Sequence, residues 1–110
     1  QYTEALDLYL KALWLSEKQN DLIGAANAQL NIGFVYLSQD EIDEAYNWFK
    51  KSLASSIKAK YKKGEAWNYS NIAIVLDRKG QYEESRKYYW KGAAFIDKEK
   101  NKREYSRIYF

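Results

Sequence analysis

Residues 31–53 read NIGFVYLSQDEIDEAYNWFKKSL, and residues 71–93, NIAIVLDRKGQYEESRKYYWKGA, carry the same pattern 40 residues later. Asparagine and isoleucine open both stretches, and valine, glutamate and lysine recur at matching places farther on. The register extends back to the start of the chain, where Tyr2 aligns with Ile42 and Tyr82. Similarity at a fixed spacing indicates stacked units, each of which buries one face against its neighbours. The sequence therefore predicts a repeat protein that serves recognition rather than chemistry.

Two types of helix alternate in the predicted repeat. Small and apolar residues at spacings of 3, 4, 3 and 1 predict amphipathic second helices, in the series Tyr2, Ala5, Tyr9, Ala12, Leu13, then Ile42, Ala45, Phe49, Ser52, Leu53, then Tyr82, Ser85, Tyr89, Gly92, Ala93. First helices are predicted at residues 22–38 and 65–79. Gly24, Gly64 and Gly80 are predicted at the joints, because glycine tolerates positive φ. The predicted fold class is all-α, an α-solenoid of antiparallel helix pairs.

This pattern resembles a known family. The matching residues are Asn31, Ile32, Gly33, Tyr36, Asp40, Ile42, Ala45, Phe49, Ser52 and Leu53, then Asn71, Ile72, Ala73, Leu76, Gly80, Tyr82, Ser85, Tyr89, Gly92 and Ala93. The chain resembles the tetratricopeptide repeat over essentially its whole length, although its period exceeds the commoner 34 residues of that family. Similar long repeats are found in kinesin light chains, polarity adaptors and peptide-sensing or kinase-linked bacterial regulators. The resemblance implies protein–protein recognition.

The register also divides the chain. Residues 1–20 are expected to form the second helix of a truncated repeat, residues 21–60 and 61–100 two complete repeats, and residues 101–110 the start of a further repeat, all in one domain of an internal fragment. Both ends are then open. The apolar side chains expected on the open faces are Leu6, Leu10, Leu13 and Trp14 at one end and Ile108, Tyr109 and Phe110 at the other. Such faces favour self-association into a homo-oligomer.

Composition argues against an enzyme. The chain lacks histidine and cysteine, which removes the commonest general base and the thiolate ligands. It has no G-x-S-x-G or P-loop motif, so no catalytic residue, cofactor or metal site is predicted. The acidic group at residues 40–44 lacks the spacing of a calcium loop and is interpreted as a helix start. Without a long apolar run, a soluble segment with no membrane contact is expected; its compartment stays open, with the cytoplasm favoured.

Two basic groups recur at the repeat spacing. They are Lys58, Lys60, Lys62 and Lys63, and then Lys98, Lys100, Lys102 and Arg103. Both are predicted where second helices end, since lysine complements the negative end of the helix dipole. Together with Tyr61 and Trp67 they also suggest a nucleic-acid surface. A net charge of only +3 makes nucleic acid the lesser alternative.

The resemblance implies that the first helices line a concave groove. Carrying the family's groove positions over marks Asn27, Leu30, Asn31, Phe34, Leu37, Ser38, Trp67, Ser70, Asn71, Ile74, Asp77, Arg78 and Arg107. Asn31 and Asn71 are predicted to bind the backbone of an extended peptide, because an amide both donates and accepts. The alternative is that both amides bond to neighbouring helices.

Some members of the family clamp a C-terminal carboxylate with lysine, arginine and asparagine. Asn71 and Arg107 fall on clamp positions, but Leu30 and Phe34 replace the remaining polar residues. An apolar or helical segment is therefore the predicted ligand. The predicted function is a non-catalytic scaffold for a protein or peptide partner. The alternative is a regulatory repeat segment that controls an attached signalling domain, such as a kinase, through self-association.

Overall fold

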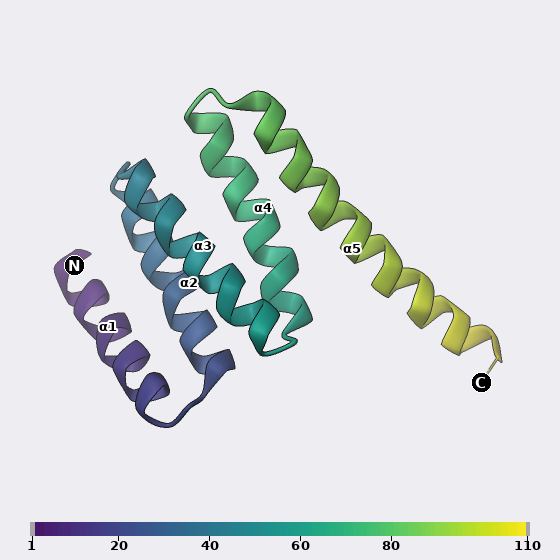
Figure 1. Cartoon of the computed structure of the whole chain (residues 1–110), viewed down its shortest axis with the longest axis horizontal. Helices are drawn as coiled ribbons and strands as arrows, with labels where there is room; N and C mark the ends of the chain where they lie inside the picture. Colours follow the sequence, from purple (N-terminus) through teal and green to yellow (C-terminus); the bar gives the residue numbers. More distant parts are fainter. Residues whose placement is uncertain (1, 110) are drawn as a thin grey trace.

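The computed structural model describes the backbone of residues 2–109 and the side chains of residues 2–95. The described part consists of helices α1 (Tyr2–Lys18), α2 (Leu22–Ser38), α3 (Ile42–Lys58), α4 (Lys62–Arg78) and α5 (Tyr82–Tyr109). Successive helices run antiparallel and are joined by tight turns (Figure 1). The predicted all-α solenoid is confirmed, and α2 spans the predicted residues, while α4 begins three residues earlier than expected.

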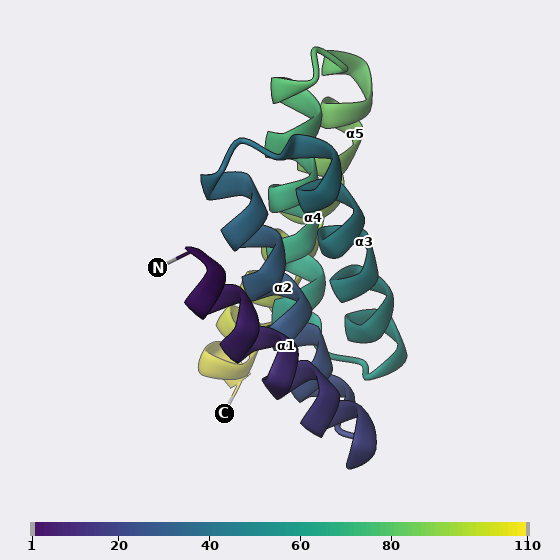
Figure 2. The same cartoon turned by 90° about the vertical axis from the view of Figure 1, so that its left-hand side faces the viewer.

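The helices form two layers. Each helix packs on its neighbour in sequence, and α2 also touches α4, the first helix of the following repeat. Viewed from the α1 side, α2 and α3 lie on opposite sides of the array (Figure 2). Within residues 2–109, no helix combines the length and apolarity that a membrane crossing requires. Placing α2 beside α4 creates the surface on which the candidate site lies.

Four turns of the same design separate the helices. Each contains one residue with positive φ, namely Asn20, Asp40, Lys60 and Gly80. In each turn the next backbone N–H donates to a carbonyl near the end of the preceding helix, as from Asp21 to Ser16 at 2.8 Å. A left-handed residue followed by such a bond is a common way to end a helix. Gly80 thus occupies the joint that the sequence predicted.

The prediction for the other two glycines is wrong. Gly24 and Gly64 lie in the first turns of α2 and α4 rather than at the joints. A Cβ atom at Gly24 would approach the hydroxyl of Ser16 to 2.6 Å, and one at Gly64 would collide with Ser56. Glycine is needed there because the preceding second helix ends against the backbone.

A core of aromatic and small side chains holds the pairs together. Phe49 is fully buried, and a Cβ atom on Gly33 would lie 2.6 Å from its ring. Ala45 and Ala73 are also fully buried. The hydroxyl of Ser85 donates to the carbonyl of Ala73 at 2.8 Å. These contacts confirm that small residues allow the helix backbones to approach closely.

Buried hydrogen bonds connect three helices. The hydroxyl of Ser52, on α3, donates to the carbonyl of Ala26, on α2, at 2.7 Å. The amide of Asn68, on α4, donates to the same hydroxyl at 2.8 Å and to the carbonyl of Gly64 at 2.9 Å. Buried polar groups that are bonded in this way fix the relative positions of the helices that carry them. The relation between α2 and α4 is therefore set through α3.

The two ends differ from expectation. Leu6 and Leu13 pack against α2 instead of facing outward, whereas Leu10 and Trp14 are exposed. At the other end α5 continues without a break to Tyr109 (Figure 1), so no turn lies near residue 100. The register places Lys100 at the position that has positive φ in the earlier turns. Positive φ is costly for a residue other than glycine, and no helix in the described chain packs beyond α5 to offset that cost. Phe110 and the side chains of Ile108 and Tyr109 lie outside the described residues.

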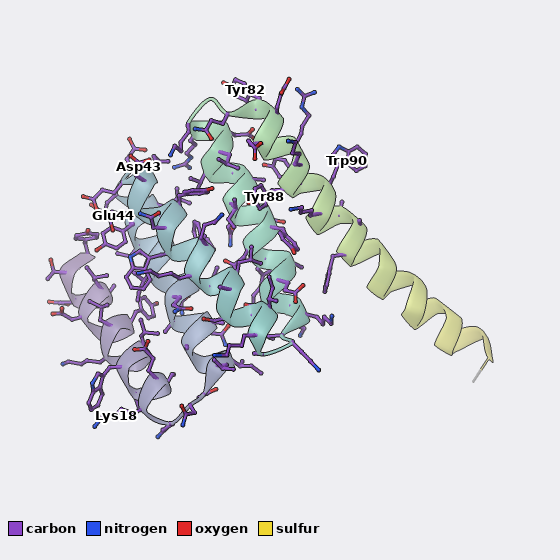
Figure 3. The ribbon with its side chains drawn as sticks, in the orientation of Figure 1. Lys18, Asp43, Glu44, Tyr82, Tyr88 and Trp90 are labelled. Atoms are coloured by element: carbon purple, nitrogen blue, oxygen red, sulfur yellow. The ribbon has the colours of Figure 1, made fainter. Side chains whose placement is uncertain are left out.

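The charged groups agree only in part with the dipole prediction. Asp43 and Glu44 lie in the first turn of α3, as expected (Figure 3), and Lys58 lies in its last turn. Lys60 occupies the turn, and Lys62 and Lys63 begin α4, where the positive end of the dipole disfavours them. The second basic group, residues 98–103, falls inside α5 rather than at its end. The prediction that both groups end second helices is therefore wrong for most members.

Candidate functional site: the groove between α2 and α4

A groove of about 700 Å³ lies between the first helices of the two repeats. The residues that line it are Asn27, Leu30, Asn31 and Phe34 from α2, Trp67, Ser70 and Asn71 from α4, and Tyr61 from the turn before α4. This volume is in the range of ligand-binding clefts. We call this surface the α2/α4 groove.

Most of the residues predicted for the site meet in the α2/α4 groove. Those brought together are Asn27, Leu30, Asn31, Phe34, Trp67, Ser70 and Asn71. Leu37 instead packs against the buried cluster that contains Phe49 and Ile72. Ile74 and Arg78 follow on α4, about one and two turns beyond Asn71, and do not line the groove. Ser38 and Asp77 do not line it either, and the side chain of Arg107 lies outside the described residues.

Tyr61 completes the groove and was not predicted as a groove residue. Its hydroxyl donates to the side-chain oxygen of Asn27 at 3.3 Å, and its ring meets the ring of Trp67 edge to face at 6.3 Å. Tyr61 occupies the N-cap position of α4 but makes no side-chain cap. Asp21 at the equivalent position of α2 accepts a hydrogen bond from the backbone of Gly24 at 2.9 Å. Tyrosine is not a helix-capping residue, whereas the equivalent Asp21 is, and this difference was the signal in the sequence that Tyr61 has another role.

The walls of the groove are apolar, and other aromatic rings hold them in place. Phe34 and Trp67 remain 42% and 47% exposed. The ring of Phe34 meets that of the fully buried Phe49 edge to face at 5.3 Å. Edge-to-face pairs restrict the orientation of both rings. The aromatic surface is therefore already in place before a ligand arrives.

The floor of the groove carries two amides available for binding. Asn31 and Asn71 are half-buried, and neither side chain bonds to another of the described side chains or to the described backbone. The interpretation that they serve neighbouring helices therefore has no support within residues 2–95. Among the side chains of residues 2–95, none that lines the groove is charged. A neutral apolar surface with two free amides suits an uncharged ligand that offers its own donors and acceptors.

A tyrosine on α4 makes the stability of the fold depend on pH. Burial raises the pKa of Tyr69 above its ordinary value of 10.0, and the charges of Glu65 and Tyr88 raise it further. The folded chain then keeps a phenol proton that the unfolded chain has begun to lose. The contribution of Tyr69 to stability is full below about pH 10 and is lost as the pH rises through its folded pKa.

We therefore expect the free energy of unfolding to fall as the pH rises above about 10, and to fall less steeply in Tyr69→Phe. Urea titrations across this range, followed by circular dichroism, measure both slopes. The hydroxyl of Tyr69 donates no hydrogen bond among the described residues, so phenylalanine is a close steric replacement. Equal slopes in parent and variant would contradict the role given to burial.

Comparison with known proteins identifies the repeat. The sequence model of the tetratricopeptide repeat matches residues 24–94, which include all of α4 and all but the first two residues of α2, the two helices that form the groove. The chain belongs to the tetratricopeptide repeat family. Tetratricopeptide repeats generally mediate protein–protein interaction, and the layered helix pairs of this chain follow the same plan.

A solved structure supports the assignment of this tetratricopeptide repeat chain. The crystal structure of the apo form of RapI is similar, with a TM-score of 0.81 and 28% sequence identity. The match covers 96% of this chain and 38% of RapI, so the chain spans well under half of that protein. No curated protein matches the sequence.

Proposed function

We propose that the α2/α4 groove binds a peptide segment of a protein partner. The observation that carries the proposal is the combination of exposed, fixed aromatic rings with the unbonded amides of Asn31 and Asn71 in one uncharged groove. An extended peptide presents alternating N–H and C=O groups, which an amide side chain pairs with in both directions. Phe34 and Trp67 then accept an apolar side chain of the peptide.

Two further observations support this function. Tyr61 occupies a helix N-cap position, but its side chain makes no capping hydrogen bond and instead contacts Asn27 in the groove. Its side chain therefore contributes to the groove surface and not to the helix cap. The buried hydrogen bonds through Ser52 and Asn68 hold α2 and α4 at a fixed separation. A preformed groove lowers the entropy lost on binding. Leu30, Phe34 and Trp67 give the described lining an apolar character, which favours recognition of an internal or apolar segment.

Asn71→Ala combined with Phe34→Ala is expected to abolish peptide capture while leaving the helical content unchanged. The double variant removes one amide and one aromatic wall, and both side chains are at least partly exposed. A random heptapeptide library displayed on phage is selected against the parent chain, and the enriched peptides are synthesised. Calorimetry then measures their affinity for parent and variant, with an expected loss of at least about 100-fold.

The matched control is Asn47→Ala combined with Trp90→Ala. It also removes one amide and one aromatic ring, from exposed sites on α3 and α5, and Trp90 projects away from α4 (Figure 3). Peptides that bind in the α2/α4 groove retain their affinity for this control. Peptides that bind the groove variant as tightly as the parent, and lose affinity for the control, would move the site to the convex face.

A further inference from the structure

The charged residues near the turns differ between the two edges of the helix array. The α1–α2 and α3–α4 turns lie at one edge, where α2 and α4 begin, and the other two turns lie at the opposite edge (Figure 1). The opposite edge is rich in carboxylates, with Asp43 and Glu44 on α3 (Figure 3) and Glu83 and Glu84 on α5. Residues 58–63, around the α3–α4 turn, contain four lysines and no acidic residue. The groove-forming helices therefore begin at a basic edge.

The lysines of the α3–α4 turn have no acidic partner among the described side chains. They are Lys58, Lys60, Lys62 and Lys63, and all four are exposed. None of them forms an ion pair within residues 2–95, whereas Lys79 at the opposite edge lies 2.8 Å from Asp43. Lys58 suits the last turn of α3, but Lys62 and Lys63 oppose the positive end of the α4 dipole. Like charges that the fold does not use indicate a partner outside it.

Two of these lysines stand beside one end of the α2/α4 groove. Lys63 precedes Trp67 by four residues, so it lies one turn earlier on the same face of α4. Lys60 directly precedes Tyr61, which lines the groove. We call Lys60 and Lys63 the basic mouth of the groove.

Other charged groups near the basic mouth are engaged elsewhere. Asp21, in the α1–α2 turn, accepts a hydrogen bond from the backbone of Gly24 at 2.9 Å. Glu65 lies on the side of α4 that carries Tyr69, and its charge helps to raise the pKa of that tyrosine. Lys62 lies 5.6 Å from an aromatic ring of α5. An acidic group that arrives from outside therefore finds the basic mouth unoccupied by the described side chains.

The other end of the groove is not basic. α2 ends at Ser38, and Asp40 follows in the turn. On α4, Asp77 and Arg78 carry opposite charges next to each other. Among the described side chains, a peptide in the groove thus meets net positive charge only at the end where Tyr61 lies.

We infer, resting on the peptide binding proposed above, that the α2/α4 groove selects peptides whose apolar segment is flanked by acidic residues at the Tyr61 end, where they pair with Lys60 and Lys63. The part of the peptide inside the groove stays uncharged, as the lining requires. A carboxylate accepts hydrogen bonds from the lysine ammonium group, and the opposite charges strengthen them. Exposed ion pairs contribute little each, so the lining supplies most of the affinity and the basic mouth discriminates between peptides.

Calorimetry on matched peptides tests the inference. The tightest heptapeptide from the phage selection is extended at either end by two glutamates, two glutamines or two lysines. At one end, the glutamate form is expected to bind about 3- to 10-fold more tightly than the glutamine form, and the lysine form more weakly than either. Raising the salt concentration from about 0.05 M to about 0.5 M is expected to remove most of this difference.

Lys60→Gln with Lys63→Gln is expected to bind the glutamate and glutamine forms equally, and the glutamine form as tightly as the parent does. The matched control, Lys11→Gln with Lys50→Gln, removes the same charge from exposed sites on α1 and α3 and is expected to keep the preference for glutamate. Circular dichroism confirms that both variants stay folded. A carbodiimide, which joins a carboxylate to an adjacent amine, is expected to cross-link the glutamate form to Lys60 or Lys63, as mapped by mass spectrometry.

Three results would overturn the inference while peptide binding stands. The first is equal affinity for the glutamate and glutamine forms at both ends. The second is a preference for glutamate that survives Lys60→Gln with Lys63→Gln. The third is a polythymidine oligonucleotide that binds the parent but not this variant, while the peptides are indifferent to charge, which would assign the basic mouth to nucleic acid. Failure of the proposed function has a different signature, because peptides would then bind Asn71→Ala with Phe34→Ala as tightly as the parent, and the inference would fall with it.

Discussion

Phe49→Ala is expected to lower the free energy of unfolding by about 3–5 kcal/mol, the usual cost of removing a buried phenylalanine. Phe49 is fully buried, fills the space that Gly33 leaves open, and meets the ring of Phe34 edge to face. Alanine leaves a cavity that the helices cannot close, since buried hydrogen bonds fix their separation. Urea denaturation followed by circular dichroism measures the loss, which is a large share of the stability of a typical domain.

Tyr89→Ala is the matched control because Tyr89 occupies the position of Phe49 in the next repeat. Tyr89 is 42% exposed, as no further helix packs on that face among the described residues. Its substitution is expected to cost much less. Equal losses in the two variants would show that burial between consecutive repeats does not distinguish these positions, and would contradict the packing described for α3.

Ala45→Leu is expected to cost about 1–3 kcal/mol through overpacking. Ala45 is fully buried in the cluster that contains Phe49 and Ile72, and leucine brings three more carbon atoms into that space. The variant has to displace α3 from a neighbouring helix or force its side chain off its preferred rotamer. A thermal melt reports the loss as a lower midpoint.

Ala54→Leu makes the same chemical change on the exposed side of α3. Its expected effect is small, since surface substitutions away from special features change stability little. The comparison separates overpacking from any general effect of leucine in this helix. A variant at position 45 that melts no lower than the parent would refute the close approach of the helices.

The repeat register predicted the helices well because the residues that recur at helical spacing are also the residues that are buried. Ile42 and Tyr82 begin α3 and α5 as expected, and Leu22 begins α2. Gly24 was misinterpreted because a glycine near a helix start serves equally for positive φ or for close approach, and only the position of Ser16 decides between them. At the last joint the register predicted a turn near Lys100 that α5 does not make.

Sequence predicts a site residue where its role depends on which face of a helix it occupies. It does not predict how far the groove extends, because that depends on the separation between two helices. Asn31 and Asn71 fall on one face by periodicity, and the structure brings both into the α2/α4 groove. Ile74 shares that face but lies beyond the groove, because the extent of a groove depends on the separation of two helices along their length. Tyr61 precedes α4 and has no helical periodicity from which its direction could be read.

The order of contacts along the chain has a consequence for folding. Each helix meets its neighbours in sequence, and α2 with α4 is the only pairing that skips a helix among the described residues. Loops that close over such short separations cost little entropy, so folding is expected to be fast and to spread from one repeat to the next. Unfolding then starts at the ends, in α1 and in the far part of α5. The groove-forming helices lie between these ends, so fraying of either terminus leaves the α2/α4 groove assembled.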